Sequence, residues 1–550
     1  MKSLLISCLL LVATYIGQAQ KSEGVELSEL DSSFLNWYNM DPELDQVQGA
    51  SVNLAYKELL QSKEAKKKIV VAVLDGGVDL NHEDLKDRIW INENEIPNNG
   101  IDDDKNGYVD DVNGWNFLGN SKGDNIITEN LEALRIVRKY EPIFKNVSSI
   151  DELESKDHES YQLYLICKDE CNQAKAKYLK RKGQIERFAK RLNRAETIVK
   201  RALNKNDITR DDVKKLEAKN EMQKAAKDFL LNIYSKGFKK ESFNNDRERT
   251  DLFIDKHLNP EFQPRKIIGD DVSDITDAHY GNNNVATETA EHGTFVAGII
   301  AARRDNQLGI DGIAQNVEIM ALRVVPHGDE RDKDVALAIR YAVDNGADIV
   351  NMSFGKNYSP QKEMIDDAIK YAEENNVLLV HAAGNEGMNV DEEIRYPSPI
   401  LINGKHVENF LSVGANSKNA NQKFCGIFTN YGEKNVDIFA PGVDVISLHP
   451  ENKYKMRQGT SYSAPVVAGV AALVWSYYPD LSAVELKHVL MSSSNQYKRL
   501  KVLIPNIKEK QKKKAKFTKL SVSGGTVNAY KALLEAEKLQ AKKHVQLSKS

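Results

Sequence analysis

Cysteine is scarce in this chain, with only 4 among 550 residues. One of them, Cys8, lies in an N-terminal segment that we expect to be removed, which leaves Cys167, Cys171 and Cys425. Three is an odd number, so the sequence offers no disulfide framework. Cys167 and Cys171 are one helical turn apart, but no histidine or further cysteine accompanies them to complete a metal site. We interpret all three as surface or packing thiols.

The chain also lacks an excess of either charge. Its 76 Lys and Arg nearly balance 80 Asp and Glu, which gives a formal net charge of −4 at pH 7. A nucleic-acid partner normally leaves a strongly basic balance, so the composition gives no case for one.

Long hydrophobic runs are confined to the N-terminus. Lys2 precedes an apolar stretch from Leu4 to Gly17, and Gly17-Gln18-Ala19 has the small-x-small pattern of a cleavage site. The stretch has 14 residues, whereas a membrane span needs about 20. We expect residues 1–19 to be a signal peptide, and the protein to be soluble and exported to the periplasm or the extracellular space, with no membrane span.

What the sequence does contain is a serine at the start of a helix of small residues. Gly459-Thr460-Ser461 leads into a run of small apolar residues that continues to Leu473. A hydroxyl there would lie at the positive end of the helix dipole, beside unpaired backbone N–H groups that can stabilise an oxyanion. The alternative is a capping serine on a buried helix, and the presence of reactive partners decides between the two.

Three further segments supply such partners. The β-branched run from Lys68 reads as a buried parallel strand that ends at Asp75, where α/β proteins place functional groups. His292 opens a second helix of small residues, and Asn385 lies on a glycine-framed turn after the strand Val377–Val380. Each residue alone could be structural. Together, in the order Asp, His, Asn, Ser, they are not expected by chance.

In these motifs the chain resembles the subtilisin family of serine endopeptidases, whose triad follows the order Asp, His, Ser along the chain. The resemblance covers about residues 65–125 and 268–495. Gly76 stands where the family usually has Ser or Thr, Phe295 replaces a common His, and Tyr462 replaces a common Met. None of these departures removes a reacting group, so they concern substrate fit.

The resemblance implies a role for each residue. Ser461 would be the nucleophile, His292 its general base and Asp75 the carboxylate that orients the imidazole, with Asn385 completing the oxyanion hole. Ser353-Phe354-Gly355 would form an edge that pairs with an extended protein or peptide substrate. His82 and His381 compete for the base role and are expected to be structural. The alternative function is a catalytically silent peptide-binding or scaffold protein with the same fold.

A long insertion separates the first two catalytic segments, since Asp75 and His292 are 217 residues apart. The excess lies mainly in residues 129–264, which are rich in Lys, Glu and Arg and have helical periodicity. Asp151 to Asn204 predicts one very long helix. A turn at residues 204–207 and a capping sequence at Thr209–Asp212 predict a second helix that reaches residues 234–237.

We therefore expect an antiparallel helical hairpin. The residues expected in its seam are Tyr161, Leu165, Phe188, Leu192, Ile198 and Leu230. Such a hairpin is either a solvated charged arm, or a lid, exosite or inhibitory element that a protein partner could bind. The second interpretation is favoured because both ends of the hairpin are tethered beside the expected cleft.

An acidic loop before the insertion predicts a structural Ca²⁺ site. The oxygen-bearing residues Asp102, Asp104, Asn106 and Asp111 surround Gly107, in the manner of a calcium loop. The distal glutamate of an EF-hand is missing, so another geometry is expected, and an acidic turn is the alternative. By resemblance alone, Asp84 and Asn306 match positions where many subtilisins bind calcium.

The rest of the chain alternates strands and helices, as a doubly wound parallel α/β sheet of the subtilisin type requires. The expected organisation is a signal peptide (1–19), an N-terminal extension (20–64), the first part of the catalytic domain (65–128), the helical insertion (129–264), the second part of the catalytic domain (265–495) and a lysine-rich C-terminal segment with a helix (496–550).

Overall fold

The structure, a computed structural model, describes residues 24–508 and 513–547. The expected signal peptide, residues 1–19, lies outside them. The described chain divides into two compact units, of which one is Ala133–Gln263 and the other holds the remaining described residues. Within the described ranges, no helix is both long enough and apolar enough to cross a membrane.

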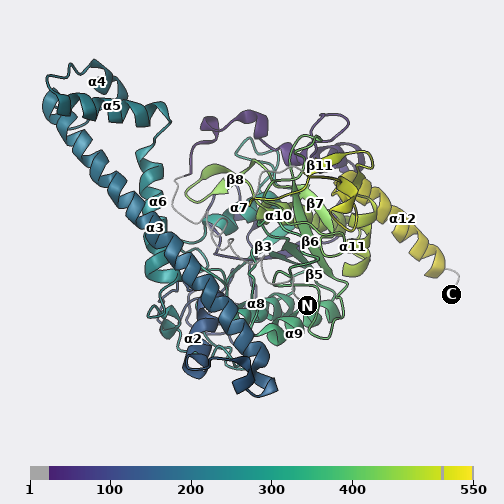
Figure 1. The fold of residues 1–550 in the computed structure, drawn as a ribbon. Coiled ribbons are helices and arrows are strands. Elements are labelled where there is room, and N and C mark those ends of the chain that lie inside the picture. The colour runs from purple at the N-terminus through teal and green to yellow at the C-terminus, as the bar shows by residue number, and fades with distance from the viewer. Residues whose placement is uncertain (1–23, 509–512, 548–550) are drawn as a thin grey trace. The chain divides into compact units, whose positions relative to one another are not determined.

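A mostly parallel sheet forms the centre of the larger unit (Figure 1). Its nine described strands lie in the order β10-β13-β7-β6-β5-β4-β1-β3-β2, and β10 alone pairs antiparallel. The doubly wound parallel sheet predicted from the sequence is confirmed. The strands are β1 (Ile69–Asp75), β2 (Gly114–Asn116), β3 (Val317–Arg323), β4 (Ile349–Met352), β5 (Leu378–Ala382), β6 (Phe410–Asn416), β7 (Ile438–Pro441), β10 (Asn495–Gln496) and β13 (Gly525–Thr526).

Helices cover both faces of the sheet because successive strand residues point to opposite sides. In β1, Val71 and Val73 join the hydrophobic cluster that contains α7 and α10, whereas Ala72 and Leu74 join the cluster that contains α8 and α9. The helices of this unit are α1 (Val52–Ala55), α7 (Glu291–Ala301), α8 (Asp332–Asp344), α9 (Lys362–Glu374), α10 (Thr460–Tyr477), α11 (Ala483–Ser492) and α12 (Ala529–Leu547). Two small antiparallel pairs add β8 (Val445–His449) with β9 (Lys453–Arg457), and β11 (Lys501–Leu503) with β12 (Lys514–Lys516).

Segments at both ends of the described chain belong to the same core. Trp37 and Tyr38 are completely buried; the Trp37 indole donates to the Asp444 carbonyl and the Tyr38 hydroxyl to the Asp311 carbonyl. Near the other end, β13 pairs with β7, and α12 packs against α1, α10 and α11. Residues outside the expected limits 65 and 495 therefore help to hold the sheet that carries the site.

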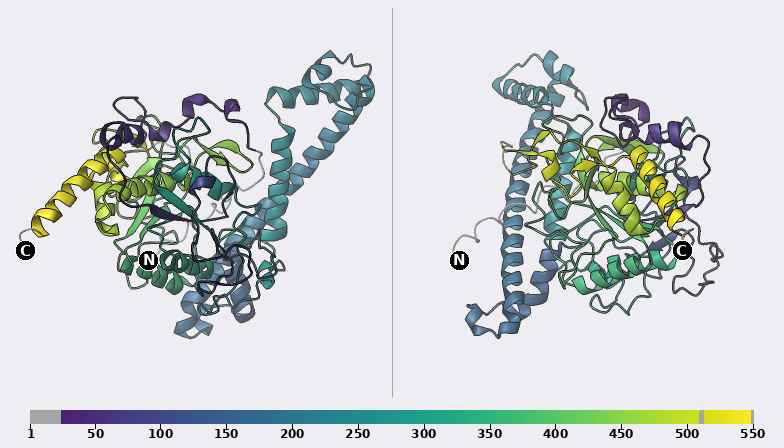
Figure 2. Two further views of the ribbon diagram at one scale, coloured as in Figure 1. Left: turned by 180° about the vertical axis from the view of Figure 1, so that it is seen from behind. Right: turned by 90° about the vertical axis from the view of Figure 1, so that its right-hand side faces the viewer.

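The insertion contains the predicted long helix, α3 (His158–Leu203), which Figure 2 shows as one unbroken element. It begins at His158 rather than at Asp151, because two short 3-10 turns, Ile150–Glu152 and Ser155–Asp157, precede it. The prediction of a single returning helix is wrong. The Thr209–Asp212 capping box is present, but α4 ends after Lys215, and the Asn220 side chain caps a new helix. The helices of the insertion besides α3 are α2 (Glu132–Phe144), α4 (Arg210–Lys215), α5 (Glu221–Ser235) and α6 (Lys240–Leu252), which continues into a π-helical turn at Phe253–His257.

The predicted seam is partly correct. Leu192 and Leu230 are buried in one cluster, and Phe188 and Ile198 pack against it. Tyr161 is also buried, but against Phe144 of α2 rather than against a returning helix. Leu165 is 45% exposed. Because each residue of an α-helix turns by about 100°, the buried side chain is its neighbour Tyr164, and Leu165 points away.

Candidate active site

Asp75 ends the central strand β1 and is 2% exposed. Its backbone is held on one side by β3, where Asp75 stands opposite Arg323, and its Oδ1 accepts the Gly76 N–H at 2.7 Å. The carboxylate therefore has a fixed position at the carboxyl edge of the sheet, where functional groups gather in parallel α/β folds.

Glycine at position 293 lets α7 approach this carboxylate closely. A Cβ on Gly293 would lie 2.1 Å from the Gly77 carbonyl oxygen and 3.0 Å from the Asp75 Cβ. The preceding residue, His292, consequently reaches Asp75, and its Nδ1 lies 2.8 and 2.9 Å from the two carboxylate oxygens. Donation from Nδ1 leaves Nε2 as the basic nitrogen of the neutral ring.

The environment of His292 favours a basic imidazole. Burial alone lowers the pKa of this ring, but the charge of Asp75 and its hydrogen bond to Nδ1 outweigh burial, and the pKa of His292 is raised overall. Its side chain is 27% exposed, so the ring is still open to a reacting group.

Ser461 lies in the first turn of α10, and this turn contacts Asn385 and Ser353 and packs near His292. The Asn385 Oδ1 accepts the Thr460 N–H at 2.8 Å and the Thr460 hydroxyl at 3.0 Å. The Ser353 hydroxyl donates to the Ser461 carbonyl at 2.8 Å. Next to Ser461, the Tyr462 ring lies 5.5 Å from the His292 ring between centroids. Segments that are up to 386 residues apart in the sequence thus meet at one place.

The two competing histidines occupy structural positions. The His381 Nε2 donates to the Phe354 carbonyl, and burial lowers the pKa of His381 to about 4. His82 is buried beside the Lys453 carbonyl, and burial lowers its pKa as well. Neither ring faces a carboxylate in the way that His292 faces Asp75.

The predicted substrate edge, Ser353-Phe354-Gly355, follows the end of β4. The Asn351 amide donates to the Ser353 hydroxyl, and the Arg395 Nη2 donates to the Gly355 carbonyl at 3.2 Å. Arg395 lies outside every sequence motif and was therefore not selected in the sequence analysis. Its guanidinium nevertheless lies beside the predicted substrate edge.

Comparison with known proteins places this architecture in a family. The model of the subtilase family matches residues 66–519. The chain belongs to the subtilase family, a family of serine proteases. The insertion between the Asp75 and His292 segments, with its long helix α3, lies inside the matched range.

Characterised subtilases resemble parts of the chain. Subtilisin DY of Bacillus licheniformis is 36% identical over 212 residues, which are 38% of this chain and 72% of that protein. The cell wall-associated protease of Bacillus subtilis is 35% identical over 224 residues, which are 40% of this chain and only 23% of that protein. Among solved structures, the prenylagaramide maturation protease PagA matches with 27% identity and a TM-score of 0.36, covering 45% of this chain and 82% of that one.

The acidic loop of this subtilase gathers three carboxylates. Oxygen atoms of Glu95, Asp104 and Asp111 all lie within 4.8 Å of one another. The Asn106 amide donates to both Asp104 and Asp111. Asp102 instead accepts the backbone N–H groups of Asn106 and Gly107 and so shapes the turn. Glu95 was not expected, because it precedes the acidic run by several residues.

The second predicted calcium position is also built by contact between distant segments. Asp84 is 1% exposed, its Oδ1 accepts the Asn306 amide at 2.7 Å, and its Oδ2 accepts the Ile310 N–H at 3.1 Å. Burial is the main cause that raises the pKa of Asp84 to about 6.

Proposed function

We propose that this chain is a serine endopeptidase that hydrolyses peptide bonds through Asp75, His292 and Ser461. The observation that supports this most directly is the pair of short contacts from the His292 Nδ1 to the Asp75 carboxylate, beside the helix turn that carries Ser461. Four residues that the sequence singled out for one reaction also occupy neighbouring segments of the fold.

The proposed mechanism begins with attack of the Ser461 Oγ on the scissile carbonyl carbon. His292 takes the hydroxyl proton on Nε2, while Asp75 stabilises the imidazolium that forms. Collapse of the tetrahedral intermediate breaks the C–N bond, and His292 returns the proton to the leaving amine. Water then attacks the acyl-enzyme with His292 again as the base, and Ser461 leaves with the proton.

Asn385 is proposed to stabilise the oxyanion. Its Oδ1 is engaged by Thr460, which orients the opposite, NH₂ end of the amide toward the substrate. Together with the Ser461 N–H it would donate to the carbonyl oxygen as negative charge develops there. Removing one such donor costs about 10²–10³-fold in turnover in a related enzyme.

Labelling with a fluorophosphonate probe tests this function against a catalytically silent protein. We expect the purified chain to be labelled and to cleave members of a fluorogenic peptide library, and Ser461→Ala to do neither. Ser463→Ala is the matched control, because that hydroxyl lies in the same helix but donates to the Ala440 carbonyl. Unlabelled wild-type protein that is folded would favour the peptide-binding or scaffold alternative.

We also propose that Ca²⁺ binds this protein as a structural ion. Three carboxylates that lie close together repel one another unless a cation neutralises them. Burial is the first cause that raises the pKa values of Glu95 and Asp111, and neighbouring acidic groups raise them further. Oxygen-rich clusters of this kind suit Ca²⁺. Glu95, Asp104 and Asp111 would hold one ion, and Asp84 with Asn306 would contribute to a second.

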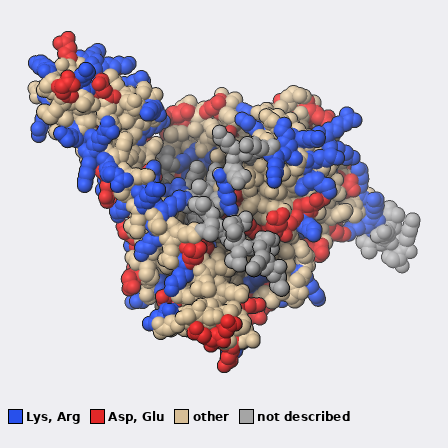
Figure 3. Space-filling view, in the orientation of Figure 1, with Lys and Arg blue, Asp and Glu red and all other residues tan. Residues whose placement is uncertain are grey.

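Export of the protein is proposed from the signal-like pattern of residues 1–19. A separate proposal is that the insertion binds a protein partner. Residues 133–263 carry 30 Lys and Arg against 22 Asp and Glu, a net charge of +8. Since the whole chain has a net charge of −4, the other residues carry −12. Figure 3 shows Lys and Arg spread over α3, α4 and α5. A partner for this surface would be an acidic protein.

A further inference from the structure

Arg395 joins the two segments that flank the proposed site of peptide cleavage. Its Nη2 donates to the carbonyl of Gly355, the last residue of the predicted substrate edge, at 3.2 Å. The same guanidinium pairs with Glu386 at 2.9 Å, and Glu386 directly follows Asn385. A third contact runs from Nη1 to the Asn357 side chain. A positive charge therefore lies beside both the substrate edge and the oxyanion residue.

The backbone around Arg395 is firmly held. Lys356 and Tyr396 exchange two backbone hydrogen bonds of 3.0 Å each, so the segment that carries Arg395 runs antiparallel to the end of the substrate edge. Glu386 is fixed as well, because its second carboxylate oxygen accepts the Asn430 amide at 2.6 Å. These contacts hold the guanidinium of Arg395 in one position.

This guanidinium still has donors to offer. The Arg395 side chain is only 12% exposed, and its buried Nε–H has no hydrogen-bond partner among the described residues. A buried charged donor without an acceptor is unfavourable. Nη1 carries a second N–H besides the one that faces Asn357, and a substrate carboxylate is a strong, charge-assisted acceptor for such a donor.

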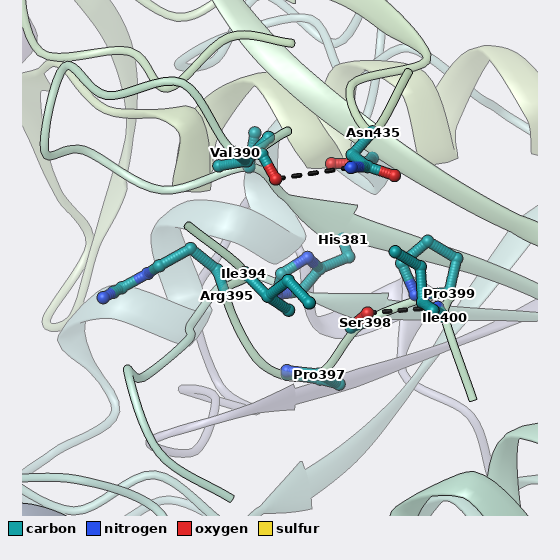
Figure 4. Close-up of a pocket in the computed structure, with 11 residues that line it drawn as sticks. His381, Val390, Ile394, Arg395, Pro397, Ser398, Pro399, Ile400 and Asn435 are labelled. Atoms are coloured by element: carbon teal, nitrogen blue, oxygen red, sulfur yellow. Dashed lines mark hydrogen bonds between the residues drawn. The ribbon is translucent and has the colours of Figure 1, made fainter. Parts of the chain in front are cut away.

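The small cavity that Arg395 helps to line does not account for its charge. This cavity has a volume of about 20 Å³, room for about one water molecule, and is also lined by His381, Ser398 and Asn435. In Figure 4 the guanidinium of Arg395 points away from His381 and the other labelled residues. It is directed instead toward the groups that it contacts, Gly355 and Glu386.

We propose that Arg395 determines specificity and that the site prefers a peptide with Asp or Glu immediately before the scissile bond. This inference rests on the proposed function. A bound peptide would pair with Ser353–Gly355 and place its scissile carbonyl at Asn385. The side chain immediately before the scissile bond would then lie beside the space between these two segments of the protein, where Arg395 lies. Glu386 neutralises the arginine in the free protein, and the substrate carboxylate accepts from the remaining N–H of Nη1.

The competing substrate classes fit this space less well. A Lys or Arg side chain of the substrate would be repelled by the guanidinium of Arg395. The Glu386 carboxylate would not compensate, because it already accepts from both Arg395 and Asn430. A large apolar side chain would cover the charged guanidinium of Arg395 without supplying an acceptor. Glutamine has the shape of glutamate but lacks the charge, so comparing the two isolates the contribution of the ion pair.

The test compares matched fluorogenic peptides with Glu, Gln, Asp, Asn, Ala or Lys before the cleaved bond. We expect kcat/KM of the wild type to favour Glu over Gln by about 10- to 100-fold, the ratio that one or two charge-assisted hydrogen bonds supply. Arg395→Gln should bring this ratio close to one, and Arg395→Lys should retain part of it. Glu386→Gln should increase it, because the arginine then loses its internal partner.

Arg303→Gln is the matched control, since Arg303 also pairs with an acid, Asp87, but is exposed and contacts neither segment. Fluorophosphonate labelling of each variant shows whether its active site is intact. If the wild type favours Gln over Glu, or if Arg395→Gln labels normally and keeps the wild-type ratio, the inference is overturned. Absence of cleavage and labelling in the wild type would instead contradict the proposed peptidase function.

Discussion

His292 and Asp75 set the pH dependence that we expect of the activity. The base must be neutral to accept a proton, and Asp75 raises the pKa of His292. We therefore expect kcat/KM to rise with pH through an apparent pKa above about 6.5, the ordinary value for histidine. A profile that is already flat below that pH would show that another group, or an unperturbed histidine, limits the reaction.

Asp75→Asn should separate the effect of the negative charge of Asp75 from the effect of its side-chain shape. The amide keeps the volume of the side chain but favours the wrong imidazole tautomer, and in a serine protease such a change lowers kcat by about 10⁴-fold. Without the negative charge, the pKa of His292 should also fall, so the residual activity should develop at lower pH than in the wild type. Measuring the pH profiles of both proteins checks the two effects independently.

Tyr462 is expected to hold the His292 ring in place. The Tyr462 ring packs 5.5 Å from the His292 ring and 4.5 Å from the Phe295 ring, between centroids. Tyr462→Phe keeps this packing and should retain activity, whereas Tyr462→Ala should lower kcat by up to about 10²-fold because the base is displaced. Equal activities for the two variants would contradict a positioning role.

At the residue scale, the sequence analysis selected residues that lie within motifs and did not select those that only the fold brings close. Asp75, His292, Asn385 and Ser461 each stand in a recognisable local pattern. Glu95 lies outside the alternating acidic run, and Arg395 has no neighbouring motif. Their positions depend on how loops return to the sheet, and no local residue spacing encodes that.

At the scale of elements, two glycines in helices should respond oppositely to the same substitution. In α10, a Cβ on Gly469 would lie 2.8 Å from the Ile313 Cβ, so Gly469→Ala should destabilise by about 1–3 kcal/mol through overpacking. In α3, a Cβ on Gly183 would meet only the end of the Arg187 side chain at 3.4 Å. Gly183→Ala should stabilise that helix by about 0.5–1 kcal/mol. Denaturant unfolding of both variants measures the difference.

The acidic loop gives a second prediction at this scale. If Ca²⁺ binds only the folded protein, it stabilises by about 2.7 kcal/mol when its concentration is 100 times the Kd, and EDTA should lower the Tm accordingly. Asp104→Asn with Asp111→Asn should remove most of the response to EDTA. Asp124→Asn is the control, because that exposed carboxylate accepts only from the Asn120 amide within the described part of the chain. An unchanged response in the double variant would exclude this loop as the site.

Elements were predicted best where the pattern was strong and buried. The strands β1 and β3 to β7 are mostly apolar and almost entirely buried, so the hydrophobic pattern of the sequence locates them. The break between α4 and α5 was missed because Leu216 and Asn220 sit in a continuous helical periodicity. There α4 ends at Lys215 because Leu216 is extended, and α5 begins where the Asn220 side chain accepts the Gln223 N–H.

At the scale of the whole molecule, we expect that the insertion can be removed without loss of stability only if the deletion is confined to residues 133–263. Residues 133–263 form a compact unit with hydrophobic clusters of their own. The flanking residues do not belong to it. Glu132 forms a buried ion pair with Lys356 at 2.7 Å, and Arg265 pairs with Asp270 and Asp334. A short Gly/Ser linker in place of residues 133–263 should therefore leave the core and the active site intact.

A longer replacement, of residues 129–265, is the contrasting variant. It removes Glu132 and Arg265 and leaves Lys356 and Asp334 buried with fewer partners, which should cost about 3–5 kcal/mol for each broken pair. We expect the shorter replacement to fold and to hydrolyse a small peptide ester at the wild-type rate or faster. The longer one should unfold at a lower denaturant concentration even if it is active.

The ratio of activities in the shorter replacement then shows what the insertion does. Residues 133–263 contain none of the residues proposed for the reaction, so their removal should not affect the chemical step. If the insertion governs access to the site or binds a protein partner, cleavage of folded proteins should change relative to hydrolysis of the small ester, most of all for acidic substrates, which its net charge of +8 would attract. Raising the ionic strength should then abolish the difference between acidic and basic protein substrates in the full chain but have little effect on the shortened one. An unchanged ratio at every salt concentration would identify the insertion as a passive arm.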